Sequence, residues 1–382
     1  MKKFIIILII FITSGLLSCF VFKTDIPLFS PFWKNDFNIQ LSDFEIIGGF
    51  LPYWTLSKLK YSNYFNNLYY FSFKIESNGD IVTDSKKDLG FYRLQNNSVA
   101  LNYFNAKQTK IQKGLTITQF NNNDIESFLN SSESQENFLT QIKPFFDNNQ
   151  FNNLVIDIEY SGSQSARLRP QFTDFINLVQ TRLKDKKDFV LSVCVYARSA
   201  TYQQIWDIAD LSNKINYFII MAYDYFNSSS LKPGPVSPIN DTVDHNILFH
   251  LKSFLKLTEA NKLVLALPLY GYGWQVDNFD LEIARTTPNT GFSISLEQLN
   301  QLENKIKAND WQVFWDEQSS SPYVFYQEEE KKYIIFFENT RSLQLKVDLA
   351  KKLGLKGVAF WALGYEGVGF DWSQIFNVNL KK

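Results

Sequence analysis

Two acidic residues, Asp157 and Glu159, close an otherwise apolar stretch at residues 151–160, FNNLVIDIEY. On a β-strand successive side chains alternate between faces, so Val155, Asp157 and Glu159 share one face and the opposite face is apolar. Both acids then point the same way at the C-terminal end of the strand, where parallel α/β folds place their chemistry. Two neighbouring carboxyl groups can share a proton, which indicates acid–base catalysis. The alternative is a structural pair held by an arginine or by backbone amides.

Predicted strands and helices alternate on both sides of this stretch. We expect eight strands, at residues 46–54, 66–75, 113–120, 151–160, 189–197, 217–225, 265–274 and 357–366. We expect helices at residues 134–148, 169–184, 242–260 and 342–353, the last capped by Ser342 and ended by Gly354. Such alternation is typical of a parallel sheet with crossover helices, and eight strands favour a closed (β/α)8 TIM barrel, an α/β fold.

The chain between the seventh and eighth strands is too long for an ordinary loop. From about residue 275 to residue 339 it holds three stretches typical of antiparallel strands, WQVFWDEQ, SPYVFYQEEE and KYIIFFEN, and a helix near residues 295–307. We therefore expect a small α+β insertion within a barrel domain that spans residues 45–382.

Composition limits the partners that the chain can have. Its 382 residues include 38 basic and 39 acidic side chains, a net charge of −1, without a long basic run. That balance gives no electrostatic basis for binding nucleic acid. A zinc site built on His245 and His250 would lack further nitrogen or sulfur ligands, and no nucleotide-binding glycine motif occurs. We therefore expect no metal and no cofactor. We also expect a monomer.

The first 18 residues are typical of a secretion signal, with two lysines before an apolar run too short for a comfortable transmembrane helix. Cys19 ends the sequence LLSC, which resembles the lipobox in which bacteria acylate a cysteine. We expect residues 19–44 to be a tether and the protein to be lipid-anchored in the bacterial cell envelope, on the outer surface or the periplasmic face. The alternative is an ordinary signal peptide with a chance cysteine.

Four stretches, in the same order along the chain, resemble the motifs of glycoside hydrolase family 18, the chitinases and N-acetylglucosaminidases. They are FNNLVIDIEY, YFIIMAYDY, LALPLYGYGW and GVAFWALGYE. In the family the first reads roughly F-D-G-[LIV]-D-[LIV]-D-x-E, so Asp157 and Glu159 match, whereas Val155 replaces an acid. The resemblance extends from about residue 48 to the C-terminus and implies a TIM barrel whose inserted subdomain walls one side of a groove. Peptidoglycan and spore-cortex relatives also commonly lack the middle acid, which points away from a standard chitinase.

The resemblance implies retaining, substrate-assisted hydrolysis of β-linked N-acetylglucosamine glycans, either chitooligosaccharides or peptidoglycan. In that mechanism the N-acetyl oxygen of the substrate attacks the anomeric carbon. By resemblance Glu159 is the general acid/base, Asp157 steadies the acetamide and Tyr223 bonds to it. The other implied sugar-binding residues are Asp224, Met221 and Trp361, the last as the floor under the reactive sugar, with Phe50, Tyr53, Tyr270, Tyr272 and Trp274 as candidates for further subsites.

Two other functions stay open. The chain could be a catalytically weak or inactive chitinase-like lipoprotein that binds N-acetylglucosamine glycans as a lectin, although such relatives usually lose the acid that Glu159 retains. It could also serve as an adhesion scaffold. The alternative for Tyr223 and Trp361, which the motifs disfavour, is that they are core residues with satisfied polar groups. Cys194, inside the predicted strand at residues 189–197, is expected to be a small buried hydrophobe.

Overall fold

A computed structural model of the chain describes residues 44–106, 111–202, 204–242, 244–299, 312–367 and 370–376. The expected signal peptide, Cys19 and the tether up to residue 43 lie outside the described residues. Over the ranges just given, no helix is both long enough and apolar enough to cross a membrane.

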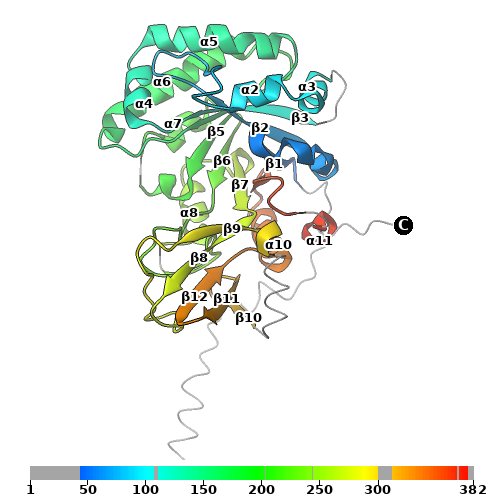
Figure 1. Cartoon of the computed structure of the whole chain (residues 1–382). Coiled ribbons are helices and arrows are strands. Elements are labelled where there is room, and N and C mark those ends of the chain that lie inside the picture. Colours follow the sequence, from blue (N-terminus) through cyan, green and yellow to red (C-terminus); the bar gives the residue numbers. More distant parts are fainter. Residues whose placement is uncertain are drawn as a thin grey trace, which may run out of the picture. The chain divides into compact units, whose positions relative to one another are not determined.

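Eight parallel strands of the described chain close into a barrel (Figure 1). Around the barrel their order is β1, β13, β7, β6, β5, β4, β3 and β2, which is chain order once β13 follows β7. This closed barrel, with helices between its strands, confirms the predicted (β/α)8 fold. The strands are β1 (Ile46–Pro52), β2 (Asn67–Lys74), β3 (Gln112–Gln119), β4 (Asn153–Ile158), β5 (Val190–Tyr196), β6 (Tyr217–Met221), β7 (Leu263–Pro268) and β13 (Gly357–Trp361).

The side chains of β4 divide between two environments, as their alternation predicts. Leu154, Ile156 and Ile158 belong to the large apolar core that also holds side chains of the surrounding helices. Val155 belongs to a second cluster inside the barrel, formed with side chains of β1, β2, β5, β6, β7 and β13. Asp157 follows Val155 on this inward face, so the sequence pattern alone directs its carboxyl group into the barrel.

Two glycines make room for an aromatic ring in the barrel interior. A Cβ on Gly48 would lie 2.6 Å from Tyr69 Cε2, and a Cβ on Gly114 would lie 2.5 Å from Tyr69 Cδ1. The Tyr69 hydroxyl is 3.0 Å from the Tyr217 hydroxyl, which accepts a hydrogen bond from Asn153 Nδ2 at 2.5 Å. This buried polar chain fills the barrel on the N-terminal side of the site and satisfies its own hydrogen bonds.

Helices and short 3-10 turns connect the strands, and α4, α5 and α6 pack outside the barrel (Figure 1). Asn339, not Ser342 as predicted, caps α10, because Asn339 Oδ1 accepts from Ser342 N and Ser342 Oγ accepts from Asn339 N, both at 2.9 Å. Gly354, with φ of 66°, follows the end of this helix as expected. The predicted helix at residues 242–260 is shorter, since Asn246 caps α8. The segments are η2 (Tyr53–Tyr64), α2 (Gly90–Gln95), α3 (Ser98–Asn105), α4 (Asn122–Leu129), α5 (Ser132–Asp147), α6 (Ser165–Leu183), η3 (Ala197–Ala200), α7 (Ile208–Ser212), α8 (Ile247–Phe254), η4 (Ala260–Lys262), α10 (Thr340–Lys352) and α11 (Trp372–Ile375).

A second, antiparallel sheet follows β7 in the chain (yellow and orange in Figure 1). The three strands predicted for this segment are present as β10, β11 and β12. Residues 270–274, expected as the end of the seventh barrel strand, instead belong to β8 of this sheet, where β8 pairs with β12 and β9. Of the helix predicted near residues 295–307, residues 296–299 are helical and residues 300–307 lie outside the described ranges. The strand order is β10 (Val313–Asp316), β11 (Ser321–Glu328), β12 (Lys331–Phe336), β8 (Tyr270–Val276) and β9 (Phe292–Ser295).

Candidate active site

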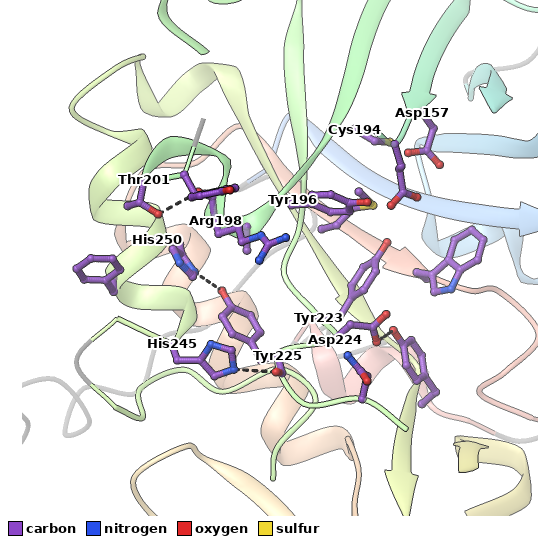
Figure 2. A pocket seen from close by; sticks show the side chains of 18 of the residues that line it. Asp157, Cys194, Tyr196, Arg198, Thr201, Tyr223, Asp224, Tyr225, His245 and His250 are labelled. Atoms are coloured by element: carbon purple, nitrogen blue, oxygen red, sulfur yellow. Dashed lines mark hydrogen bonds between the residues drawn. The ribbon is translucent and has the colours of Figure 1, made fainter. Parts of the chain in front are cut away.

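A cavity of about 930 Å³ opens at the C-terminal ends of the barrel strands. Its walls come from the ends of β4, β5 and β6, from β1, β2 and β13, and from the loop before α8 (Figure 2). The position agrees with the usual site of catalysis in such barrels. Eight of the residues predicted for the site line this cavity: Phe50, Asp157, Glu159, Met221, Tyr223, Asp224, Tyr270 and Trp361.

Asp157 is buried at the inner wall of the cavity, with 4 % of its surface exposed. The thiol of Cys194, on the neighbouring strand β5, hydrogen-bonds to its carboxyl group. Burial raises the pKa of Asp157 well above its usual range, Glu159 raises it further, and the bond from Cys194 opposes the rise. Asp157 Oδ1 has no hydrogen-bond partner among the described residues. Asp157 and Glu159 can therefore share a proton, and Asp157 keeps one oxygen available to a ligand.

Glu159 follows on the same face of the chain and is half-buried. Its backbone N–H donates to the carbonyl oxygen of Gln119 at 3.0 Å, which extends the ladder between β3 and β4 and fixes the backbone of Glu159. Burial raises the pKa of Glu159, the hydrogen bond from the Tyr196 hydroxyl opposes this rise, and the charge of Asp224 adds to it. A carboxyl group with a raised pKa at a cavity wall is suited to donate a proton near neutral pH.

The end of β6 and the residues after it contribute Met221, Tyr223 and Asp224 to the cavity. Asp224 has a φ of 59°, a left-handed conformation that is uncommon outside glycine and often marks a functional site. Its Oδ1 accepts hydrogen bonds from the Tyr270 hydroxyl at 2.6 Å and the Tyr272 hydroxyl at 3.0 Å. Burial raises the pKa of Tyr223 well above its usual range, so its hydroxyl stays protonated and can donate to a ligand in the cavity (Figure 2).

Trp361, the last residue of β13, joins this cavity to a second one of about 560 Å³. The two cavities share Trp361, Asp224 and Tyr270, so together they form one cleft. The indole contacts Phe50, with 5.7 Å between ring centroids, and Phe71, with 4.5 Å, and both contacts are edge to face. A ring held in this way offers a fixed surface on which the apolar face of a sugar can stack.

Two residues predicted for further subsites line neither cavity, and the full burial of Trp274 makes the prediction wrong for that residue. Trp274 is fully buried in the apolar core of the second sheet, where its Nε1 donates to the carbonyl oxygen of Asn227 at 3.1 Å. Tyr53 packs on the main core, while its neighbour Trp54, which is 47 % exposed, lines the second cavity. Because β1 ends at Pro52 and a 3-10 turn follows, strand alternation does not extend to these two aromatics.

The end of β5 and the turn after it supply cavity residues that sequence reasoning missed, namely Tyr196, Arg198 and Tyr202. Cys194, expected only as a buried hydrophobe, is 2 % exposed and also borders the cavity. A signal was available for part of this set, since alternation places Cys194 and Tyr196 on one face of the strand that follows the acidic one. Arg198 lies beyond the strand, where alternation gives no signal.

Both histidines at the cavity bond to Tyr225 (Figure 2). His245 Nε2 donates to the carbonyl oxygen of Tyr225 at 2.7 Å, and the Tyr225 hydroxyl lies 2.9 Å from His250 Nδ1. Burial lowers the pKa of His250 to about 4, so this ring is neutral at pH 7. In the described part of the chain, no three His, Cys, Asp or Glu side chains gather as metal ligands. The histidines therefore shape the cavity wall.

Comparisons with known proteins point to one family. The family profile described as "Glycosyl hydrolases family 18" matches residues 46–366. Among curated proteins, the chain is 26 % identical over 332 residues to the uncharacterized glycosylase YvbX of Bacillus subtilis, covering 84 % of this chain and 86 % of that one. It is 24 % identical over 319 residues to the cortical fragment-lytic enzyme of the same organism, covering 79 % of this chain and 65 % of that one.

Solved structures share the fold at lower identity. The spore cortex-lytic enzyme SleL of Bacillus megaterium QM B1551 superposes with a TM-score of 0.66 at 19 % identity, covering 87 % of this chain and 72 % of that one. The GH18 chitinase of Cycas revoluta, crystallised with allosamidin, gives a TM-score of 0.69 at 18 % identity, covering 84 % of this chain and 96 % of that one. At these identities the likeness extends to the fold.

Proposed function

We propose that this chain, which belongs to family 18 of the glycosyl hydrolases, cleaves β-linked N-acetylglucosamine glycans with retention of configuration and with Glu159 as general acid/base. The observation that carries the proposal is the state of Asp157 and Glu159. Both face a cavity and both have a raised pKa. Among the described residues no ion pair joins either of them to a basic side chain.

In the first step the acetamide oxygen of the sugar that stacks on Trp361 attacks the anomeric carbon of the same sugar. The bond to the leaving oxygen breaks as Glu159 donates its proton to that oxygen. Asp157 accepts a hydrogen bond from the acetamide N–H and steadies the positive charge of the cyclic intermediate, while Tyr223 donates to the acetamide oxygen. In the second step Glu159 takes a proton from water, which opens the cyclic intermediate from the face of the departed group and so retains the configuration.

The acetamide group is the nucleophile because the cavity offers no protein carboxylate suited to that role among its described residues. β7 ends in LALP, without an acid. Asp224 is held by two tyrosine hydroxyls, and Asp244 is exposed on the loop before α8. Retaining enzymes that use two carboxyl groups hold them about 5 Å apart in a fixed geometry, which an exposed loop acid does not supply. Asp157 shares one face of the chain with Glu159, whereas the nucleophile and the acid of a two-carboxylate enzyme stand on either side of the scissile bond.

Val155 favours a second candidate, a glycan-binding protein with weak catalysis. This side chain is fully buried on the inward face two residues before Asp157, and it can neither ionise nor form a hydrogen bond. A proton that leaves Asp157 therefore finds no acceptor at Val155. Glu159 weighs against this candidate, since a half-buried acid with a raised pKa serves proton transfer and has no evident use in binding alone.

Incubation of the full chain with chitooligosaccharides and with purified peptidoglycan, followed by mass analysis of the products, tests the proposal. We expect fragments with new reducing ends at N-acetylglucosamine from at least one of the two substrates. The Glu159→Gln chain is the matched control and should give none at the same exposure. Binding of both glycans by the wild-type chain, without any product, would favour the second candidate.

We also propose that the protein is a lipoprotein of the bacterial cell envelope, anchored through Cys19 and the tether at residues 19–44. The support is the leader and the LLSC sequence that ends it. Metabolic labelling with a fatty acid should mark the wild-type chain, and the Cys19→Ser chain should take up no label and leave the membrane fraction. A wild-type chain without label would make Cys19 part of an ordinary signal peptide.

A further inference from the structure

One wall of the cavity carries a cation without an acidic partner. Arg198 is the one lysine or arginine among the described residues that line the cavity, and no ion pair within the described part of the chain includes it. Its contacts are with aromatic rings, since Arg198 Cζ lies 6.0 Å from the ring centroid of Tyr196 and 5.5 Å from that of Tyr202. Figure 2 shows the guanidinium directed into the cavity. Its donors are therefore available to a ligand.

The turn that carries Arg198 is fixed by its own hydrogen bonds and by packing. The carbonyl oxygen of Arg198 accepts from Thr201 N at 2.9 Å, Thr201 Oγ1 at 2.9 Å and Tyr202 N at 2.8 Å. The neighbouring residues Ala197 and Ser199 are buried, and η3 packs against α8. A charged group on a supported turn can recognise a ligand more specifically than one on an unsupported loop.

Tyr196 connects Arg198 to Glu159, the acid that faces the leaving sugar in the proposed mechanism. In the proposed mechanism Asp157 binds the acetamide of the sugar that stacks on Trp361. Glu159 donates its proton to the glycosidic oxygen that joins this sugar to the leaving sugar. Tyr196 donates a hydrogen bond to Glu159, and the guanidinium of Arg198 lies against the same tyrosine ring. The next sugar beyond Glu159 therefore reaches the wall that carries Tyr196 and Arg198.

We propose that Arg198 binds a carboxylate on the leaving sugar, so that the preferred bond joins N-acetylglucosamine to a sugar with a 3-O-lactyl group, as in peptidoglycan glycan strands. This inference rests on the proposed function and names its substrate class. A guanidinium and a carboxylate form two parallel charge-assisted hydrogen bonds, whereas a chitin chain has no anionic group to offer. Asp244 borders the same cavity, but no ion pair joins it to Arg198. Tyr202, 65 % exposed, leaves this end open to a substituted glycan.

Three β-1,4 tetrasaccharides test the inference with the full chain. One alternates N-acetylglucosamine with its 3-O-lactyl ether, the second is the same glycan with each lactyl carboxylate converted to an amide, and the third is chitotetraose. The readout is the ratio of kcat/KM for the acid to that for the amide, two glycans of equal size that differ in charge. We expect a ratio of roughly 10 to 100 for the wild-type chain, from charge-assisted hydrogen bonds in a partly exposed site.

Arg198→Gln should bring this ratio to about one, because glutamine keeps hydrogen-bonding capacity and loses the charge. Arg198→Lys should give an intermediate ratio, since the charge stays and the planar fork is lost. Arg182→Gln, at an exposed position on α6 where the arginine pairs with Glu136, is the control and should keep the wild-type ratio. Added salt should lower the wild-type ratio and leave that of Arg198→Gln where it is.

The possible outcomes distinguish failure of the role proposed for Arg198 from failure of the proposed hydrolase function. A wild-type ratio near one, or an Arg198→Gln chain that keeps the wild-type ratio, overturns the role of Arg198 and leaves the hydrolase in place. A wild-type chain that cleaves none of the three glycans overturns the proposed function, and the inference with it. Circular dichroism shows whether a variant is folded. If Arg198→Gln cleaves none of the glycans, Arg198→Lys becomes the test. An acid-to-amide ratio for Arg198→Lys equal to that of the wild type then contradicts the proposal.

Discussion

The end of β4 and the segment just before α10 both bury carboxyl groups, and they treat them in opposite ways. Just before α10, Glu338 is fully buried, and its Oε2 accepts hydrogen bonds from Lys346 Nζ at 2.7 Å and Ser342 Oγ at 2.6 Å. At the end of β4, Asp157 and Glu159 face a cavity, and in the described chain no cation pairs with either. A buried acid costs free energy unless it is paired. The unpaired acids are therefore the ones that a function must explain.

The pKa shifts of the two regions have different causes. Burial raises the pKa of Glu338, and the attraction and hydrogen bond of Lys346 oppose the rise. Burial likewise lowers the pKa of Lys346, and Glu338 opposes that change. For Asp157, burial and the neighbouring acid Glu159 act in the same direction. A buried carboxyl group is thus not enough to identify a catalytic acid, whereas one that lacks a cation and borders a cavity is a strong candidate.

The largest expected effect is on catalysis at the unpaired pair. Glu159→Gln keeps the shape of the side chain and removes the transferable proton, so turnover should fall roughly a hundred- to ten-thousand-fold. Steady-state kinetics with the substrate that the wild-type chain cleaves, together with circular dichroism to verify the fold, measures this. Hydrolysis near the wild-type rate would end the assignment of Glu159 as the acid.

Breaking the ion pair between Glu338 and Lys346 should lower the stability of the fold. Lys346→Met leaves Glu338 buried without its cation, which should lower the free energy of unfolding by about 3 to 5 kcal/mol. Urea denaturation measures the change, and turnover at low temperature should stay near the wild-type value. The double variant Glu338→Gln with Lys346→Met should recover much of the loss. If Lys346→Met is as stable as the wild type, the ion pair contributes nothing to the stability of the fold. The contrast with the unpaired acids at the end of β4 would then be lost.

Asp157→Asn should lower activity and change how stability depends on pH. Turnover should fall roughly a hundred- to thousand-fold if Asp157 steadies the charged intermediate. The folded chain holds the Asp157 proton more tightly than the unfolded chain, so this group stabilises the fold at low pH, and that contribution is lost as pH rises above about 3.9 toward the raised pKa. Asparagine does not titrate. The variant should therefore gain stability relative to the wild type as pH rises, and a constant difference between pH 4 and pH 8 would contradict the raised pKa.

The smallest change concerns the pH profile. The Tyr196 hydroxyl donates a hydrogen bond that favours charged Glu159 and holds its pKa down. Without that bond the pKa of Glu159 rises further, so Glu159 stays protonated to higher pH. The alkaline limb of kcat/KM for Tyr196→Phe should therefore move to higher pH. If the alkaline limb stays where it is in the wild type, or moves to lower pH, Tyr196 does not lower the pKa of Glu159.

The sequence predicted the barrel and its acidic pair because both depend on local alternation. Leu154 and Asp157 fall on opposite faces of β4 as the pattern requires, and residues 217–225 and 357–366 contain the predicted strands β6 and β13. The approximate location of the site follows from the rule that parallel strands present their C-terminal ends together.

The features that the sequence did not predict lie where one strand or helix ends and the next begins. The apolar pattern runs unbroken from β7 into β8, so it did not reveal that Trp274 leaves the barrel and is buried in the second sheet. Trp54 and Arg198 lie in 3-10 turns, where no period links residue type to cavity or core. The cap of α10 was misplaced because Asn339 and Ser342 both suit an N-cap, and the reciprocal bonds between them decide which one serves.

The central claim is that the acetamide group of the substrate does the work of a nucleophile while Glu159 supplies the proton. The most direct measurement compares the rates at which the chain cleaves the same aryl leaving group from di-N-acetylchitobiose and from cellobiose, β-1,4 disaccharides that differ only in the 2-acetamido groups. The account predicts release from the acetamido compound alone, with retention of the anomeric configuration in the product. Comparable release from the cellobioside, or a sugar covalently trapped on any carboxylate of the chain, would contradict it.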